Sequence, residues 1–249
     1  MTPDVNQTVR EIAINNPATV RVFETLGIDY CCGGKRAISE ACERANVPLE
    51  KLLKLLAELG PEAVSLEEKA WGNASFRDLI GHIVSTHHAY VRGESPRLEA
   101  LLDKVVNRHG ADHPELGSIR DLFLALHQEM ITHMFKEEHV LFPFLQQMEA
   151  AFSAGEPLPP ACFDSVGTPI ARMLADHDDA GALLAKMRAL SGDFQAPAGA
   201  CPSYLGLYHG LQEFERDLHL HVHLENNILF PRALEMDQAL RQGAACVSH

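Results

Sequence analysis

The sequence predicts an all-α protein in which a small N-terminal helical domain precedes an antiparallel four-helix bundle. Apolar residues recur at intervals of three and four, the period of an amphipathic helix, whereas the alternation of a half-buried strand is nowhere sustained. Four long segments with this period are separated by breaks rich in Gly and Pro, which is typical of a bundle. One segment also occurs twice, which indicates two related pairs of helices.

The small helical domain is predicted over residues 1–60. Gly27 is expected to end one of its helices, and Pro48 opens a short amphipathic helix that Gly60-Pro61 closes. A unit of this size buries too little apolar surface to be stable by itself. We therefore expect it to pack on another part of the chain or to form a homodimer.

Residues 61–74 are the predicted linker, and residues 75–240 are the predicted bundle. Ser75 and Asp78 have the spacing of a capping box, which marks the start of a helix. The first long helix is expected to break near residues 93–96. The expected long helices cover residues 75–92, 115–150, 164–190 and 202–240, with an extra helix at 96–108 and a C-terminal tail at 241–249.

Composition and charge exclude several classes of protein. The chain has 249 residues, of which 46% are hydrophobic, enough for a sizeable core. Its 21 basic and 34 acidic residues give a formal charge of −13, which argues against nucleic-acid and anionic-membrane partners. Residues 1–11 lack the features of a signal peptide, and no apolar run reaches the roughly 18 residues of a membrane span. We expect a cytoplasmic protein.

The repeated segment carries the strongest chemical signal. Residues 133–143 read HMFKEEHVLFP and residues 221–231 read HVHLENNILFP, so that His, Glu and Leu-Phe-Pro align at an offset of 88. His133 and Glu137, like His221 and Glu225, are four residues apart, which places each pair on one face of a helix. Imidazole and carboxylate are ligands for iron, manganese or zinc, and a carboxylate can bridge two metals.

The other two long helices each offer a histidine beside an apolar stripe. His177 lies within such a stripe, whereas His87 and His88 both follow one, and the repeat offset favours His88. A single histidine on an apolar face is more often a core residue, so the metal interpretation depends on all four helices together. His219 and His223 lie about 200° around the helix from His221 and are expected to face solvent. The predicted ligands of a dinuclear site are His88, His133, Glu137, His177, His221 and Glu225.

The chain resembles a known family. Its bundle resembles hemerythrin-like proteins, and nearly the whole chain resembles the RIC family, which is named for the repair of iron centres. The resemblance is carried by four motifs: Asp29-Tyr30-Cys31-Cys32-Gly33-Gly34-Lys35, the segment from His133 through Glu138 to Leu141-Phe142-Pro143, His177-Asp178-Asp179-Ala180-Gly181, and Leu224-Glu225-Asn226-Asn227 leading to Leu229-Phe230-Pro231.

The resemblance implies a hemerythrin-like bundle with a non-haem di-iron centre. It places the iron ligands on the same six residues and selects His88 over His87. It also implies a role in restoring iron–sulfur clusters damaged by nitric oxide or oxidants. Oxygen-carrying hemerythrins have one more histidine ligand, so the resemblance counts against an oxygen carrier.

Cys31 and Cys32 are the predicted catalytic pair. One interpretation is a buried structural pair. The other is a pair of thiolates that exchange electrons, nitric oxide or iron with the bundle or a client, which requires a lowered pKa. The resemblance favours this second interpretation, and the following Gly-Gly predicts a tight turn with a close backbone approach. The four remaining cysteines are isolated and receive no role.

The leading functional hypothesis is a cytoplasmic di-iron protein that donates iron or binds nitric oxide during cluster repair. Its expected partners are damaged iron–sulfur proteins and nitric oxide. The alternative is a scavenger or sensor that lowers free nitric oxide without repairing clusters. Catalytic reduction of nitric oxide or peroxide is left open.

Overall fold

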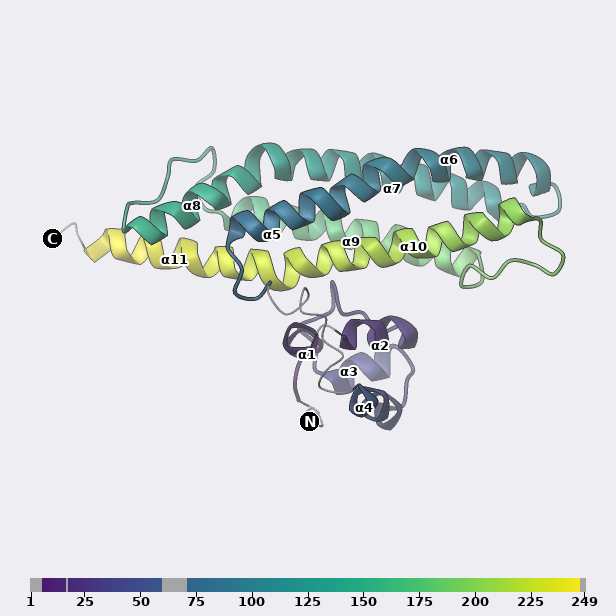
Figure 1. Ribbon diagram of the computed structural model, residues 1–249, viewed down its shortest axis with the longest axis horizontal. Coiled ribbons are helices and arrows are strands. Elements are labelled where there is room, and N and C mark those ends of the chain that lie inside the picture. The colour runs from purple at the N-terminus through teal and green to yellow at the C-terminus, as the bar shows by residue number, and fades with distance from the viewer. Residues whose placement is uncertain (1–5, 17, 60–70, 247–249) are drawn as a thin grey trace.

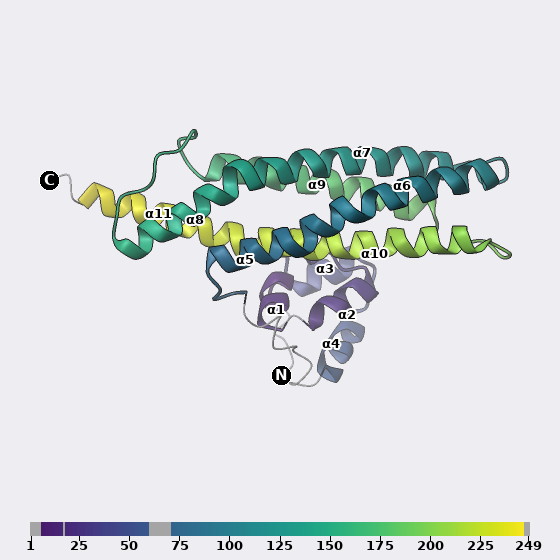
Figure 2. The same ribbon diagram turned by 45° about the horizontal axis from the view of Figure 1, so that its top comes forward.

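The computed structural model describes residues 6–16, 18–59 and 71–246, and within these residues it confirms the all-α prediction (Figure 1). A compact group of short helices lies beside a long bundle whose successive helices run antiparallel (Figures 1 and 2). An isolated bridge between Thr8 and Ala37 is the strand-like pairing found in the described residues. The predicted linker, residues 61–74, falls mostly outside the described residues.

Each long rod of the bundle contains one or more helical elements in direct succession. Three of the rods are interrupted by a π-helical turn, labelled η, and the third rod is α-helical throughout. The rods are α5 (Phe76–His82), η2 (Ile83–His88) and α6 (Ala89–His109); α7 (Glu115–Lys136), η3 (Glu137–Leu141) and α8 (Phe142–Ala154); α9 (Gly167–Leu190); and α10 (Pro202–Leu224), η4 (Glu225–Leu229) and α11 (Phe230–Cys246).

The boundaries of the first rod differ from the prediction at one point. Ser75 caps it as expected, and its side chain accepts a hydrogen bond from the Asp78 backbone. The predicted break near residues 93–96 was wrong, because α6 continues through Pro96. The next turns bury Leu98 and Leu102 completely in the bundle. This packing outweighs the hydrogen bond that proline removes.

The last rod also extends further than predicted. Its final helix, α11, ends at Cys246 rather than at residue 240. None of the helices in the described ranges is long and apolar enough to cross a membrane.

Four short helices form the N-terminal domain, as far as the chain is described there: α1 (Val9–Asn15), α2 (Thr19–Leu26), α3 (Ile38–Arg44) and α4 (Leu49–Glu58). Gly27 ends α2 with a positive φ of 65°, a conformation that glycine adopts without steric cost. Pro48 precedes α4 as predicted. The core of the domain contains one fully buried side chain from each helix: Val9, Phe23, Ile38 and Leu52.

The N-terminal domain packs on the fourth rod, near the junction of α10 and η4 (Figures 1 and 2). The buried amide of Asn227 donates to the backbone carbonyls of Tyr30, at 3.1 Å, and Cys31, at 3.2 Å. A Cβ on Gly34 would lie 2.9 Å from Asn227 Oδ1, so only glycine permits this approach. The close backbone contact expected at Gly33-Gly34 is therefore present, and the small domain packs on the chain itself.

This packing corrects the prediction for two histidines. His219 and His223 turn away from His221, as helix geometry requires, but His223 is buried and His219 is only partly exposed. The Tyr30 ring lies 6.2 Å from the His219 ring and 5.4 Å from the His223 ring, measured between centroids. His223 is buried, and burial lowers its pKa to about 4. The N-terminal domain covers the helix face that periodicity assigned to solvent.

Two apolar clusters lie on either side of a polar layer in the bundle. One includes Phe123, Met130 and Leu218 and continues into the N-terminal domain. The other includes Phe142 and Leu229 together with the start of the first rod. The polar layer between them contains the predicted metal ligands.

The Asn227 contacts predict the energy of domain packing. Asn227→Ala removes the amide donor to the Tyr30 carbonyl and the shorter of the two donors to the Cys31 carbonyl, so we expect it to lower the free energy of unfolding by about 1–3 kcal/mol. Urea unfolding followed by circular dichroism measures this loss. Asn107→Ala, on the exposed face of α6, is the matched control and should change stability little. Equal stability of the two variants would contradict the role given to Asn227.

Candidate metal centre

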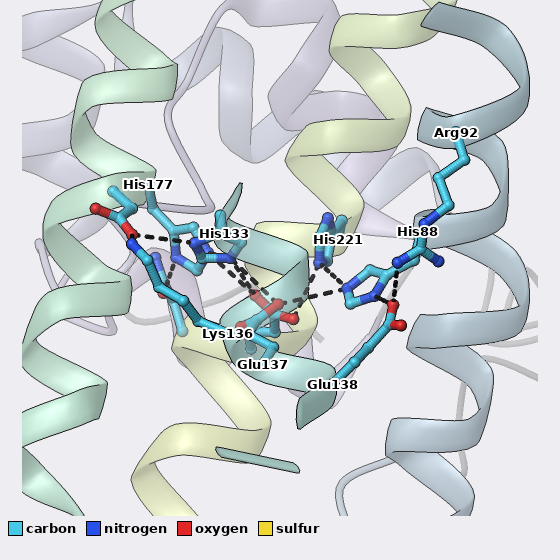
Figure 3. Close-up of polar contacts among 11 residues, drawn as sticks. His88, Arg92, His133, Lys136, Glu137, Glu138, His177 and His221 are labelled. Carbon is cyan, nitrogen blue, oxygen red and sulfur yellow. Dashed lines mark hydrogen bonds and ion pairs between the residues drawn. The ribbon is translucent and has the colours of Figure 1, made fainter. Parts of the chain in front are cut away.

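All four rods contribute to one polar layer in the middle of the bundle. His88 ends η2, His133 lies near the end of α7, His177 is in α9 and His221 is in α10. Glu137 and Glu225 begin η3 and η4. The six predicted ligands therefore meet at one place, and each is at most 1% exposed to solvent. Figure 3 shows His133 and His177 on one side of Glu137, and His88 and His221 on the other.

The three π-turns found in the described residues all adjoin this layer. A π-turn holds one more residue than an α-turn and is frequent at functional sites. In an α-helix, His87 would lie one turn after the buried Ile83. The extra residue of η2 brings His88 to the interior instead, fully buried. His87 accordingly lies outside the six-residue cluster and pairs with Asp217, its Nδ1 lying 2.9 Å from the carboxylate.

The six side chains form two overlapping groups that share both glutamates. The ligand atoms of each group lie within 4.8 Å of one another. His88 and His221 complete one group, and His133 and His177 complete the other.

Each of the four imidazoles lies close to a carboxylate oxygen. Glu137 Oε2 lies 3.4 Å from His88 Nε2 and 3.2 Å from His133 Nε2. Glu225 lies 3.0 Å from His221 Nε2 through Oε1 and 3.1 Å from His177 Nε2 through Oε2. Each carboxylate thus faces one histidine from each group, which is the placement of a bridging ligand.

Both carboxylates stay ionised despite complete burial. Burial raises the pKa of Glu225, but attraction to His221 and the nearby imidazoles of His133 and His177 outweigh it, so the pKa lies well below the usual value. Burial and the charge of Glu225 raise the pKa of Glu137, but the larger opposing effect of His133 and His88 leaves this pKa below its usual value.

The buried oxygens in this layer lack sufficient protein partners. Both carboxylate oxygens of Glu137 and Oε2 of Glu225 are buried without a hydrogen bond that meets ordinary geometry. Leaving two carboxylates in this state is costly unless cations compensate them. The residues therefore fit a metal-binding site, with nitrogen and oxygen donors suited to divalent transition metals.

Two side chains that sequence reasoning missed hold the histidines of the neighbouring rods. His88 Nδ1 lies 2.6 Å from Glu138 Oε1, which also accepts a hydrogen bond from Arg92 Nη2 at 2.6 Å (Figure 3). His177 Nδ1 lies 2.8 Å from Asn226 Oδ1. A proton on each Nδ1 leaves Nε2 free to face the glutamates. Glu138 and Asn226 directly follow the glutamates of the repeat, and this equivalence was the signal that could have found them.

The predicted catalytic cysteines lie outside the six-residue cluster but close to it. Asn226 Nδ2, from the same amide that holds His177, donates to the Cys31 carbonyl at 3.4 Å. A cavity of about 910 Å³ is lined by both cysteines and by His177. Cys31 is buried and Cys32 is exposed.

The two thiols are unequal in chemistry as well as in burial. Hydrogen bonding with Cys32, burial and the charge of Asp29 raise the pKa of the Cys31 thiol. This is the opposite of the shift that thiolate exchange requires. Cys31 therefore keeps its proton near neutral pH, and the exposed Cys32 is the thiol that a partner can reach.

Two family models match separate parts of the chain. Residues 79–233 match the family model described as the hemerythrin HHE cation binding domain. Residues 5–60 match the ScdA_N model, described as a domain of unknown function.

Curated relatives match almost the whole chain. A probable iron-sulfur cluster repair protein of Haemophilus influenzae is 34% identical over 229 residues, which cover 92% of this chain and 96% of that protein. The iron-sulfur cluster repair proteins YtfE of Dickeya chrysanthemi and Escherichia coli O157:H7 are also 34% identical, covering 92% of this chain and 97% of each relative. These similarities confirm the resemblance to repair proteins of iron centres. The chain belongs to the family of iron–sulfur cluster repair proteins that includes YtfE, and its bundle is a hemerythrin HHE cation binding domain.

Proposed function

We propose that the protein is a non-haem di-iron protein that supports the repair of iron–sulfur clusters damaged by nitric oxide or oxidants. The observation that carries the proposal is the pair of buried His/Glu groups that share Glu137 and Glu225. The names of the relatives favour iron as the metal and damaged iron–sulfur proteins as the partners.

In this proposal the protein supplies four ligands to each iron. His88 and His221 would hold one ion, His133 and His177 would hold the other, and Glu137 and Glu225 would contribute to both. Donors of this kind bind ferrous iron without the enclosure of a four-thiolate site. The chemistry that bound iron would supply here is the binding of a diatomic ligand such as nitric oxide and a source of iron for donation.

The surrounding residues orient the ligands and exclude water. Glu138 and Asn226 fix the rings of His88 and His177 by bonds to Nδ1. The two apolar clusters close the layer on both sides. The bundle therefore presents preformed ligands whose charge is already available for a cation.

We assign the contact with damaged iron–sulfur proteins to Cys31 and Cys32. The cysteines line the same cavity as His177, and Cys32 is exposed to an approaching protein. A nitric oxide scavenger or sensor would need the bundle residues and not this pair, which separates the two functions experimentally.

Replacing a bridging carboxylate tests the metal assignment. We expect Glu137→Leu and Glu225→Leu each to reduce the iron bound in the bundle from two ions to one or fewer, measured by elemental analysis and Mössbauer spectroscopy after anaerobic loading. Glu235→Leu, an exposed position in α11, should keep both ions. Retention of a bridged pair in either bundle variant would contradict the assignment.

The same variants separate a metal ligand from a structural residue. Leucine removes one of two facing buried charges, so we expect the metal-free Glu137→Leu protein to melt no lower than the wild type. The rise in Tm on adding metal should be lost. A lower Tm for the metal-free variant, with the metal-dependent rise intact, would assign Glu137 a purely structural role.

The histidine contacts predict a smaller and more local effect. Glu138→Gln weakens the charge-assisted bond to His88 Nδ1, so we expect about a 10–100-fold loss of affinity for one of the two ions. Competition with a chromophoric chelator measures both affinities. Glu129→Gln, exposed in α7, should leave them unchanged, and an equal effect of the two variants would oppose the proposed role of Glu138.

The cysteine pair distinguishes repair from scavenging. We expect Cys31→Ser/Cys32→Ser to bind iron in the bundle and nitric oxide normally but to fail to reactivate an enzyme whose iron–sulfur cluster has been damaged by nitric oxide. Cys162→Ser changes an exposed free thiol elsewhere and should retain reactivation. Full reactivation by the double variant would remove the cysteines from the repair mechanism.

A further inference from the structure

A third group of potential metal ligands lies on the N-terminal domain, outside the bundle. It contains Asp29, Cys31 and Cys32, whose ligand atoms also lie within 4.8 Å of one another. We propose that these three residues form a mononuclear site for a divalent cation of borderline softness, such as Fe²⁺ or Zn²⁺.

The distances within this group fit tetrahedral coordination. With metal–sulfur bonds of about 2.3 Å at tetrahedral angles, two thiolates lie about 3.8 Å apart. With a metal–oxygen bond of about 2.1 Å, a carboxylate oxygen lies about 3.6 Å from each sulfur. The two Sγ atoms are 3.8 Å apart, and Asp29 Oδ1 lies 3.5 Å from Cys31 Sγ. The sulfurs are far beyond the roughly 2.05 Å of a disulfide.

The local backbone holds this arrangement before any cation enters. Asp29 Oδ1 accepts a hydrogen bond of 2.9 Å from the Cys32 backbone. Gly33 lets the Asp29 side chain fold over the turn, because a Cβ there would lie 2.8 Å from Asp29 Oδ2. The carbonyls of Tyr30 and Cys31 are fixed by the bundle through Asn227. The three donors are thus preorganised, which lowers the cost of binding.

The charges in the group also suit a divalent cation. Binding replaces the proton of each thiol, so that two protons leave to solvent and two thiolates and one carboxylate face the ion. This gives a local charge of −1. Arg36 Nη1, 3.8 Å from Asp29 Oδ2, compensates the excess negative charge. A softer donor set than that of the bundle favours borderline cations over magnesium or calcium.

Three protein donors leave the fourth tetrahedral position open. The exposure of Cys32 makes the ion accessible to water or to a donor atom of a client. The cavity that the cysteines share with His177 places this ion beside the bundle site. The identification of the cellular ion as ferrous iron in transit rests on the proposed function. The existence of the site rests on the geometry of its three residues.

Titration of reduced, metal-free protein with Co²⁺ tests the site. Thiolate ligands give an intense charge-transfer absorption in the near ultraviolet, which His and Glu ligands do not give. We expect one equivalent of Co²⁺ per chain to produce this absorption, accompanied by release of two protons. Cys32→Ser should abolish the absorption, and Asp29→Asn should weaken this step at least tenfold. Cys162→Ser is the matched thiol control and should retain the full signal.

A bundle variant separates this proposal from the proposed function. Glu137→Leu should lose cobalt from the bundle and keep the thiolate absorption. Absence of that absorption in the wild type would overturn the third site, and so would its persistence in Cys32→Ser or its loss in Cys162→Ser. If the wild-type bundle bound no cobalt while the thiolate absorption appeared, the result would instead oppose the di-iron proposal. Because Cys32 is exposed, its substitution tests the site without disturbing the core.

Discussion

The burial of Glu137 and Glu225 among four imidazoles is the constraint on which the rest of the molecule depends. Two carboxylates facing each other in a dry interior are tolerable only with compensating positive charge, so the fold and its cation are linked in free energy. Each rod must bring its buried histidine or glutamate to the same level of the bundle, and apolar clusters pack on either side of that level. The polar layer therefore carries an energetic cost that binding of a cation would relieve.

Three consecutive residues connect this centre to the N-terminal domain. Glu225 faces the histidines, Asn226 holds His177 and contacts the Cys31 carbonyl, and Asn227 binds the carbonyls of Tyr30 and Cys31. A change in the position of η4 would thus be felt by both domains. Tyr30 of the small domain in turn packs against His219 and His223 on the outer face of α10.

Much of the fold and the meeting of the six side chains could be predicted from the sequence, because helical period and the repeat are local signals. What failed depended on contacts between distant segments. The predicted break at residues 93–96 is absent because Leu98 and Leu102 pack in the bundle and keep the helix continuous through Pro96. The predicted exposure of His223 is absent because the N-terminal domain covers it. Periodicity could not choose between His87 and His88, because it assumes a constant 3.6 residues per turn and η2 departs from it.

The π-turns also bear on how such a centre arises. Each is in effect a single-residue insertion that the helix absorbs locally, so that the flanking α-helices keep their phase. Deleting one residue from η3 or η4 would restore an ordinary helix while leaving both apolar clusters facing inward. The two apolar clusters hold the rods together, whereas the π-turns set which residues of each rod reach the polar layer.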